Sequence, residues 1–431
     1  LDDGRWTGYQ RWLVFLSALA VVFDGIDNQL IGVAVPAIMK DWGLTRSAFA
    51  PVVSLGYVGM MAGGALAGLA GDRIGRRTAL VACVLLFGVT TVAVLGVHSV
   101  AALAALRCLA GVGLGGAIPN ATTLSAEYVS LKHRPLAVTL TIICVPVGGI
   151  LVGLIAVPVL PTAGWRMLFF ICGGLPIVGA AALRYLMPES PRFLAHHPNR
   201  HGELRATLGR MGVAVPADAT FVDGGASAHG KRPTIGALFT PELRGDTMAL
   251  WMAYFSCLLA VYLAFSWVPS MLAGAGFGPS VASSGITAFN LGGVAGALFG
   301  GWVITRFGSR AWLLPTAVLA GISAGLMSLM PLNAGTTVFT VIAMLSVVGA
   351  LVNGVQTAMY PLAAEVYPAA IRATGMGSAL AFGRSGAVLS GYVGAWALEY
   401  RGSTAFFAIM GLAMIVSAVS LSLIRRHTPV R

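Results

Sequence analysis

The sequence predicts an all-α membrane protein with twelve transmembrane helices in two six-helix bundles. Composition, the spacing of apolar runs and a single long polar stretch support this prediction. Of the 431 residues, 57% are hydrophobic and only 10% are charged, and the mean hydropathy is +0.84. Because a water-soluble domain has about 25% charged residues, this composition excludes a soluble protein. The 56 glycines cluster in apolar segments and suit close contact between helices in lipid.

Apolar runs bounded by charges or by Pro and Gly give the twelve spans, and the first is too long and too polar at its centre for a cleavable signal peptide. A polar stretch divides the spans into six and six. We therefore expect an N-terminal bundle over 1–187, a cytoplasmic linker over 188–245 and a C-terminal bundle over 246–431. Within the linker, 199–211 predicts a short amphipathic helix at the membrane surface, and 221–230 is expected to be flexible. The expected spans are 12–35, 52–70, 78–97, 101–123, 136–158, 165–186, 247–270, 281–304, 311–330, 336–360, 373–397 and 403–424.

The distribution of Lys and Arg predicts the orientation in the membrane. Most of these residues lie near the termini and in every second loop, a pattern typical of the cytoplasmic side. Both termini are therefore expected in the cytoplasm. The net charge of +12 follows this loop pattern, so it does not indicate a nucleic-acid partner. The loops of the other side hold only Lys40, Arg46, Arg166 and Arg401.

Two carboxylates lie at the centre of the first span. Asp24 and Asp27, with Asn28, are spaced i, i+3, i+4, so they share one helix face and can point together into a polar cavity. Intramembrane carboxylates usually belong to proton or substrate paths. Two acids about 5 Å apart resist ionising together, which suits a proton carrier. The alternative is a structural ion pair, or a kink at Gly25.

Two arginines also lie inside spans, and their depths predict their partners. Measured from the outer face, Arg107 lies ~9 Å deep and Asp27 ~13 Å deep, so these two can pair. Measured from the cytoplasmic face, Arg384 lies ~18 Å deep and Asp24 ~20 Å deep, near the midplane. A guanidinium binds a carboxylate through two parallel hydrogen bonds. We expect Arg384 to bind a substrate carboxylate and Arg107 mainly to balance the two acids. The alternative for Arg384 is a structural partner for helix-end carbonyl groups.

The two halves repeat each other in parallel, which is typical of a duplicated six-helix unit. Residues 68–77 after the second span resemble residues 301–310 after the eighth, where Thr305 replaces the acid Asp72. After the fourth and tenth spans, a glutamate precedes an arginine by seven residues. The first loop could hold one conformation closed; the alternative is an ordinary basic loop. The candidate gating residues are Asp72, Arg73, Arg76, Arg77, Glu127, Arg134, Glu365 and Arg372.

Two further helix faces are candidates for a cavity wall. Asn353, Gln356 and Tyr360 fall at i, i+3, i+7 in the tenth span, and Asn290 is a lone amide in the eighth. These side chains could bind substrate, or they could form hydrogen bonds between helices. In the seventh span, aromatic residues near one stripe could stack on a planar ligand or contact lipid. They are Trp251, Phe255, Tyr262 and Phe265.

Several other patterns carry no function. The glycines 111, 113 and 116 match a dinucleotide fingerprint, but no strand precedes them and they lie within a span. Asn120-Ala-Thr122 matches a glycosylation sequon, also within a span. The five cysteines have no CxxC spacing, and we expect no disulfide, metal site, cofactor or catalytic triad. The five cysteines are Cys83, Cys108, Cys144, Cys172 and Cys257.

These features together resemble the major facilitator superfamily over the whole chain. They are the twelve spans, the six-plus-six division, GDRIGRR over 71–77 with its degenerate copy, and PESPRFL over 188–194. Asp24-Gly-x-Asp27 resembles the acidic signature of the aromatic acid/proton symporters. Arg107, Glu127, Arg372 and Arg384 occupy positions at which that family carries charged residues associated with transport.

The resemblance implies the major facilitator fold and a monomeric proton-coupled importer in the bacterial inner membrane. Its substrate would be an aromatic monocarboxylate of the benzoate, hydroxybenzoate or nicotinate type. Val145-Pro146-Val-Gly148-Gly149 departs from the signature of drug/proton antiporters, which disfavours export. The alternatives are a sugar- or drug-type facilitator of this fold and a membrane receptor that transports nothing.

Overall fold

The computed structural model describes residues 6–213, 215–216, 221, 235–333, 335–368 and 371–427, and within these ranges it contains helices and no strand. Short helices connect the long ones: η1 (Val94–Gly96), η2 (Leu131–His133), α6 (Pro191–Ala195), η3 (Pro198–Arg200), α7 (His201–Arg210) and η4 (Ile235–Phe239). The long helices are α1 (Gly8–Trp42), α2 (Arg46–Ile74), α3 (Arg76–Ala93), α4 (Val100–Tyr128), α5 (Arg134–Leu186), α8 (Arg244–Gly274), α9 (Pro279–Phe307), α10 (Ser309–Leu329), α11 (Val338–Val366), α12 (Arg372–Tyr400) and α13 (Gly402–Leu423).

Helix α5 contains two of the predicted spans. Its 53 residues are too many for one crossing of an apolar core of about 30 Å. The backbone leaves the helical region at Gly164, with φ 77° and ψ 178°, a conformation that glycine adopts without a steric penalty. In the described part of the chain, ten helices are long and apolar enough to cross a membrane. Since α5 supplies two crossings and α12 a further one, the predicted twelve-span fold is confirmed.

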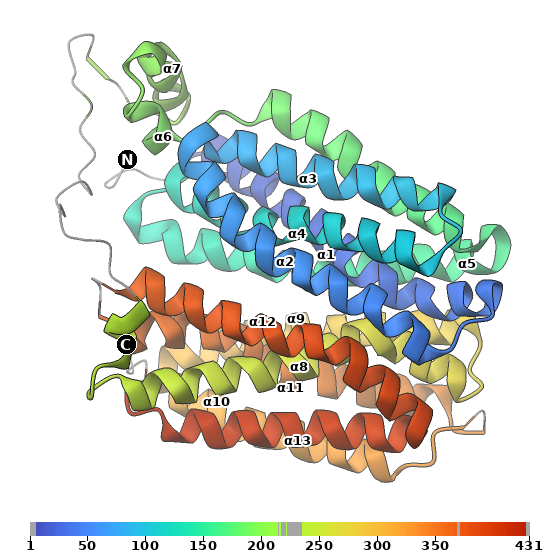
Figure 1. The fold of residues 1–431 in the computed structure, drawn as a ribbon. Coiled ribbons are helices and arrows are strands. Elements are labelled where there is room, and N and C mark those ends of the chain that lie inside the picture. Colours follow the sequence, from blue (N-terminus) through green and yellow to red (C-terminus); the bar gives the residue numbers. More distant parts are fainter. Residues whose placement is uncertain are drawn as a thin grey trace.

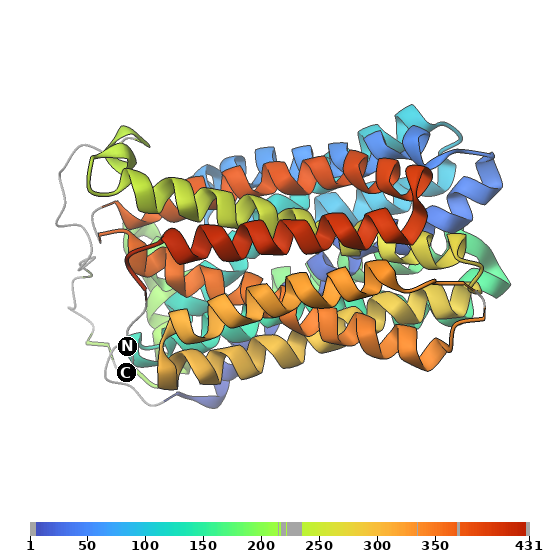
Figure 2. The same ribbon diagram turned by 90° about the horizontal axis from the view of Figure 1, so that it is seen from below.

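The long helices form two layers, coloured blue to green and yellow to red in Figures 1 and 2. In the first layer α2 packs on α4, α1 on α5 and α3 on both α4 and α5. In the second layer α9 packs on α11, α8 on α12 and α10 on α13. Since these pairings follow the same order in both halves, the packing fits parallel duplication. Contacts between the layers run mainly through α5 with α9, α2 with α12 and α1 with α8.

Glycines bring the equivalent helix pairs into close contact in both halves. A Cβ atom at Gly63 of α2 would meet the backbone of Val112 in α4, and one at Gly296 of α9 would meet the backbone of Ala350 in α11. Any larger residue would therefore force the two helices apart. The predicted use of glycine for helix packing is confirmed at these positions.

Both ends of the helical region lie at one end of the molecule, at the left of Figure 1. We call this the terminal end, where α1 begins and α13 ends, and the opposite end the distal end, where α1 stops at Trp42. The short helices α6 and α7 lie at the terminal end. Helix α7 matches the helix predicted over 199–211, and it buries Leu204 and Leu208. Of the stretch 221–230, only Phe221 lies within the described residues.

We expect Gly63→Ala to lower the free energy of unfolding by roughly 1–3 kcal/mol, because the added methyl group has no space against Val112. Thermal unfolding of the purified protein in detergent measures the effect. Gly68→Ala is the control, since the same helix offers its Cβ open space. Equal melting temperatures for the two variants would contradict this account of the α2–α4 contact.

Candidate functional site

A cavity of about 350 Å³ lies between the two layers near the middle of the helices. Its volume falls within the range of about 300–1,000 Å³ that is usual for small-molecule sites. Arg384 is the only charged residue among the described residues that line it. Tyrosines and a phenylalanine contribute much of the apolar wall: Tyr254, Tyr262, Phe265 and Tyr360.

Helix α11 supplies a polar strip of this wall. The i, i+3, i+7 spacing brings Asn353, Gln356 and Tyr360 to the cavity together. The Asn353 amide also donates to the Gly349 carbonyl oxygen at 3.1 Å, which fixes its orientation. The rings of Tyr360 and Tyr254 meet edge to face, with their centroids 6.3 Å apart. Three of the residues expected at a substrate site therefore share one face.

Arg384 reaches the cavity from α12, which belongs to the same layer as α11. Its Nη1 atom donates to the Met60 carbonyl oxygen of α2 at 2.8 Å, so the side chain bridges the two halves. This carbonyl belongs to the middle of a helix, not to a helix end as the structural alternative supposed. A guanidinium carries five N–H donors, and this bond uses one of them. Donors remain for a ligand in the cavity.

Asp27 and Arg107 form a buried ion pair. The distance from Arg107 Nη1 to Asp27 Oδ2 is 3.1 Å, and Nη2 donates to the Asp27 carbonyl oxygen at 3.2 Å. Thr91 of α3 donates its hydroxyl hydrogen to the second carboxylate oxygen of Asp27. The exposed fractions of Asp27 and Arg107 are 0% and 3%. The pairing expected from helix depth is present, and it joins α1 to both α3 and α4.

Asp24 is equally buried, but neither of its carboxylate oxygens has a hydrogen-bond partner among the described residues. Neither acid is among the residues that line the central cavity in this structure. Asp27 faces Arg107 and Thr91 within the first bundle. Asp24 instead lies close enough to Arg384 of the second bundle for their charges to interact. The alternative of a kink at Gly25 finds no support, because α1 is one continuous helix from Gly8 to Trp42. That glycine instead allows close contact with the Val145 carbonyl of α5.

Asn290 binds another amide instead of the cavity. Its Nδ2 atom donates to Gln29 Oε1 at 2.7 Å, and Gln29 Nε2 donates to Asn290 Oδ1 at 3.0 Å. Both side chains are fully buried and they connect α1 to α9. Asn290 is therefore not among the residues that line the central cavity, and its contact with Gln29 is the interhelical hydrogen bonding that was the alternative. Sequence reasoning missed Gln29, whose neighbour Asn28 faces the cavity instead.

The aromatic stripe of α8 divides between two environments. Tyr262 and Phe265 line the cavity. Trp251 instead stacks on Phe382 of α12, with the ring centroids 5.2 Å apart. Phe255 lies against the same Phe382 ring. Only part of the stripe can therefore contact a ligand in this cavity.

Hydrogen bonds between the halves concentrate toward the distal end. Ser47 donates to Glu399 from both its backbone nitrogen, at 2.8 Å, and its hydroxyl group. Ser54 donates to the Val388 carbonyl at 2.8 Å. Arg46 donates to Ser270 at 3.4 Å. The cavity extends the other way, since Thr122 and Met376 near the terminal end line it. The two halves are therefore held together at the distal end, and the cavity between them reaches toward the terminal end.

A second cavity, of about 820 Å³, lies at the distal end between α1, the kink of α5 and the helices α8 and α9. Its charged residues lie at the rim. Asp41 accepts hydrogen bonds from Trp165 at 3.1 Å and Arg166 at 3.2 Å, and Arg166 also covers the Trp165 ring. None of the predicted site residues lines it, so the central cavity is the better candidate site.

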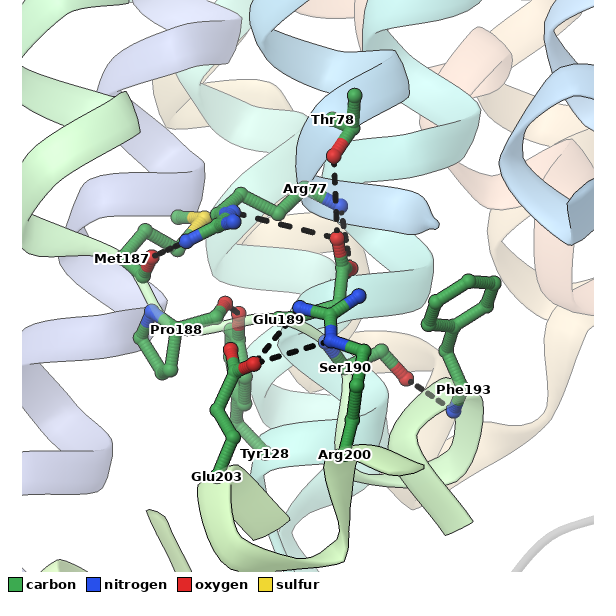
Figure 3. A network of polar contacts seen from close by, with 10 residues as sticks. All are labelled: Arg77, Thr78, Tyr128, Met187, Pro188, Glu189, Ser190, Phe193, Arg200 and Glu203. Carbon is green, nitrogen blue, oxygen red and sulfur yellow. Dashed lines mark hydrogen bonds and ion pairs between the residues drawn. The ribbon is translucent and has the colours of Figure 1, made fainter. Parts of the chain in front are cut away.

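The loop at 71–77 makes one local ion pair and one contact with a distant part of the chain. Asp72 and Arg76 pair at 2.5 Å within one turn, and Arg73 is exposed. Arg77 instead contacts Glu189 of the PESPRFL stretch, which sequence reasoning did not single out (Figure 3). Glu189 is fully buried and accepts from the backbone nitrogens of Arg77 at 2.8 Å and Ser190 at 3.0 Å. It also accepts from the Thr78 hydroxyl at 3.3 Å.

Neighbouring contacts extend this terminal-end network. Tyr128 donates its hydroxyl hydrogen to the Pro188 carbonyl at 2.6 Å, as Figure 3 shows, and Ser190 donates to Glu127. The network therefore ties the α2–α3 loop and the end of α4 to the segment that follows α5. Arg134, another candidate gating residue, is the first residue of α5. In the second half, Glu365 is exposed, and Arg372 is exposed and donates to the Tyr367 carbonyl at 3.4 Å.

Within the part of the chain that the structure describes, no group of three or more His, Cys, Asp or Glu residues is placed to hold a metal ion. The five cysteines are free thiols. The chemistry available at the central cavity is therefore binding by a guanidinium, amides and aromatic rings.

We expect Glu189→Gln to lower the free energy of unfolding by about 1–3 kcal/mol, because an amide cannot accept all the hydrogen bonds that the buried carboxylate accepts. Chemical unfolding in detergent measures the loss. Glu203→Gln is the matched control, since its pair with Arg200 at 2.7 Å is partly exposed and such pairs contribute little. If both variants unfold like the wild type, the network does not stabilise the terminal end.

Comparisons of the sequence and the structure with known proteins point to one protein family. The model of the Major Facilitator Superfamily matches residues 17–286 and 250–431. A gallate transporter of Pseudomonas putida is 33% identical over 422 residues, which cover 98% of this chain and 93% of the relative. The 4-hydroxybenzoate transporter PcaK of the same species is 36% identical over 389 residues, covering 90% and 86%. The xylose transporter XylE from E. coli, solved in an inward-open conformation, aligns with a TM-score of 0.77 at 18% identity over 97% of each chain, which shows the fold alone. These similar proteins are transporters and not enzymes.

Proposed function

The chain belongs to the major facilitator superfamily, and from this premise we propose that it is a proton-coupled symporter that imports an aromatic monocarboxylate by alternating access. The relatives named for gallate and 4-hydroxybenzoate support the substrate class. In this proposal the bundles over 1–187 and 246–431 rock about the central cavity, joined by the linker over 188–245. The terminal end faces the cytoplasm of a bacterial inner membrane, and the protein acts as a monomer.

The observation that carries the proposal is a single cation in an aromatic cavity. Among the described residues that line the cavity, Arg384 supplies the one positive charge, and the others are apolar or neutral polar groups. A guanidinium in a low-dielectric site binds one carboxylate strongly, and the tyrosine rings supply flat apolar surface for an aromatic ring. A neutral sugar has no use for this charge, which disfavours a sugar facilitator. A receptor that transports nothing has no need of the buried acids.

We expect Arg384→Lys to weaken binding of hydroxybenzoates to the purified protein at least about tenfold, because an ammonium cannot form two parallel hydrogen bonds with a carboxylate. Isothermal titration calorimetry measures the affinity. Arg107→Lys is the comparison, since Arg107 is engaged by Asp27 outside the cavity and its replacement should change affinity less. If Arg384→Lys keeps full affinity while Arg107→Lys loses it, the proposed roles are reversed.

In this proposal Asp24 is the residue that carries the proton. Asp27 already has a cation and a hydroxyl donor as partners. Asp24 is fully buried and has no donor among the described residues, and an ionised carboxylate without partners is very costly there. Its neutral, protonated form is the one that fits. In this mechanism Asp24 exchanges its proton when α1 changes its surroundings, while Asp27 remains paired with Arg107.

We expect Asp24→Asn to abolish accumulation driven by a proton gradient while keeping substrate binding and counterflow, because the amide imitates the protonated acid permanently. Proteoliposomes with and without an inward proton gradient separate the two activities. Asp27→Asn should instead cost about 3–5 kcal/mol of stability, since it leaves the buried Arg107 guanidinium without its partner. Normal gradient-driven accumulation by Asp24→Asn would remove that residue from the coupling mechanism.

A further inference from the structure

The cavity of about 820 Å³ at the distal end takes no part in the proposed function. We propose that it binds one anionic phospholipid, with the lipid phosphate at Lys40 and an acyl chain along the apolar wall. The bound lipid favours the conformation in which the distal end is closed. This conformational effect rests on the alternating access of the proposed function, whereas the lipid site itself does not.

The cavity extends from the depth of lipid headgroups to the depth of acyl chains. The first predicted span ends at residue 35, and Lys40 lies five residues beyond it, or ~7 Å at the rise of a helix. Headgroups occupy about 5–7 Å on each side of the apolar core of a bilayer. Val33 and Ala282 line the same cavity and lie within predicted spans. A phospholipid has its polar and apolar parts in this same order.

The charges at the rim leave one cation over. Asp41 accepts hydrogen bonds from Arg166 at 3.2 Å and from Trp165 at 3.1 Å, so the charges of Asp41 and Arg166 balance. Lys40 is exposed and belongs to none of the ion pairs among the described residues. One unpaired ammonium at headgroup depth matches the single negative charge of a phosphatidylglycerol headgroup.

The wall suits an acyl chain better than an aromatic acid. Trp165 is the one aromatic residue among the described residues that line the cavity. It is only 4% exposed, and the Arg166 guanidinium covers its ring at 4.2 Å. Trp42 and Phe169 meet the same ring edge to face, with centroids 5.8 and 5.9 Å away. An aromatic acid therefore finds no stacking surface here, whereas an acyl chain needs only apolar contact.

Both bundles contribute to the cavity. Leu160 of α5 lines one side and Ala273 of α8 lines the other. Pro161 and Ala163 at the kink of α5 also line it and are exposed, which leaves a lateral entrance for lipid. Because the two bundles move relative to each other in the proposed mechanism, the cavity keeps this shape only while the distal end is closed. A lipid that fits this shape shifts the equilibrium toward the closed conformation.

Native mass spectrometry of the purified full chain, offered phosphatidylglycerol and phosphatidylcholine at equal concentration, measures lipid binding. We expect the wild type to retain one phosphatidylglycerol in preference to phosphatidylcholine. Lys40→Gln should retain it ~5-fold less, which is the contribution of one basic side chain at a lipid surface. Ala273→Phe should also retain less, because its ring occupies the cavity while Lys40 stays in place. Arg401→Gln is the matched control, since Arg401 is exposed and does not line the cavity.

Backbone hydrogen exchange in nanodiscs tests the conformational effect. The Ser47 nitrogen donates to Glu399 of the other bundle at 2.8 Å, and an amide in the first turn of a helix has no partner within that helix. Its protection therefore reports closure of the distal end. Adding phosphatidylglycerol to phosphatidylcholine nanodiscs should slow exchange at Ser47 in the wild type and in Arg401→Gln. Exchange in Lys40→Gln should stay unchanged.

Three results would overturn the lipid site: equal retention of the two lipids by the wild type, equal losses in Lys40→Gln and Arg401→Gln, or displacement of the lipid by excess 4-hydroxybenzoate. Retention of the lipid with no change in exchange at Ser47 would overturn the conformational effect alone. A lysine in the last turn also favours a helix end, so the melting temperature checks folding of Lys40→Gln. If that variant does not fold, Ala273→Phe decides. None of these measurements reports acid binding at Arg384, so their failure leaves the proposed function intact.

Discussion

The ion pair between Asp27 and Arg107 fixes the rotation of α1, and much of the central structure depends on that rotation. A charge buried in the bilayer must be paired, so the Asp27 side of the helix is turned toward α3 and α4. Successive helix residues are about 100° apart. Asn28 therefore meets the cavity, and Gln29 meets α9. One electrostatic requirement thus distributes three consecutive polar positions, Asp27, Asn28 and Gln29, among different environments.

Close packing at glycines holds the helices of each bundle together, so that the buried polar side chains keep their positions. In lipid, apolar side chains gain little by leaving the solvent, so helices are held together by van der Waals contact and by polar groups. Backbone contacts at Gly63 and Gly296 provide such contact in equivalent places of the two halves. The buried network around Glu189 adds a polar anchor at the terminal end of the first bundle (Figure 3). Within each half, the strong interactions are therefore internal.

The contacts between the halves are of a different kind. Ser47 with Glu399, Ser54 with Val388 and Arg46 with Ser270 are mostly hydrogen bonds of hydroxyl and backbone groups toward the distal end. Water can replace these partners at modest cost, because the net contribution of such a hydrogen bond is about 1 kcal/mol. Separation of the distal end is therefore much easier than disruption of either bundle. This division of strength suits a protein in which two bundles move as units around a fixed site.

The sequence by itself determined the twelve spans, the parallel repeat and the pairing of Asp27 with Arg107. These follow from local rules: apolar length, helix period and depth along a helix of known rise. It did not reveal that Asp24 lacks partners, that Asn290 meets Gln29 across 261 residues, or that Glu189 organises the terminal end. The tertiary structure decided these, because a helix period gives the face that residues share but not the direction in which that face turns. That direction depends on how all neighbouring helices pack at once.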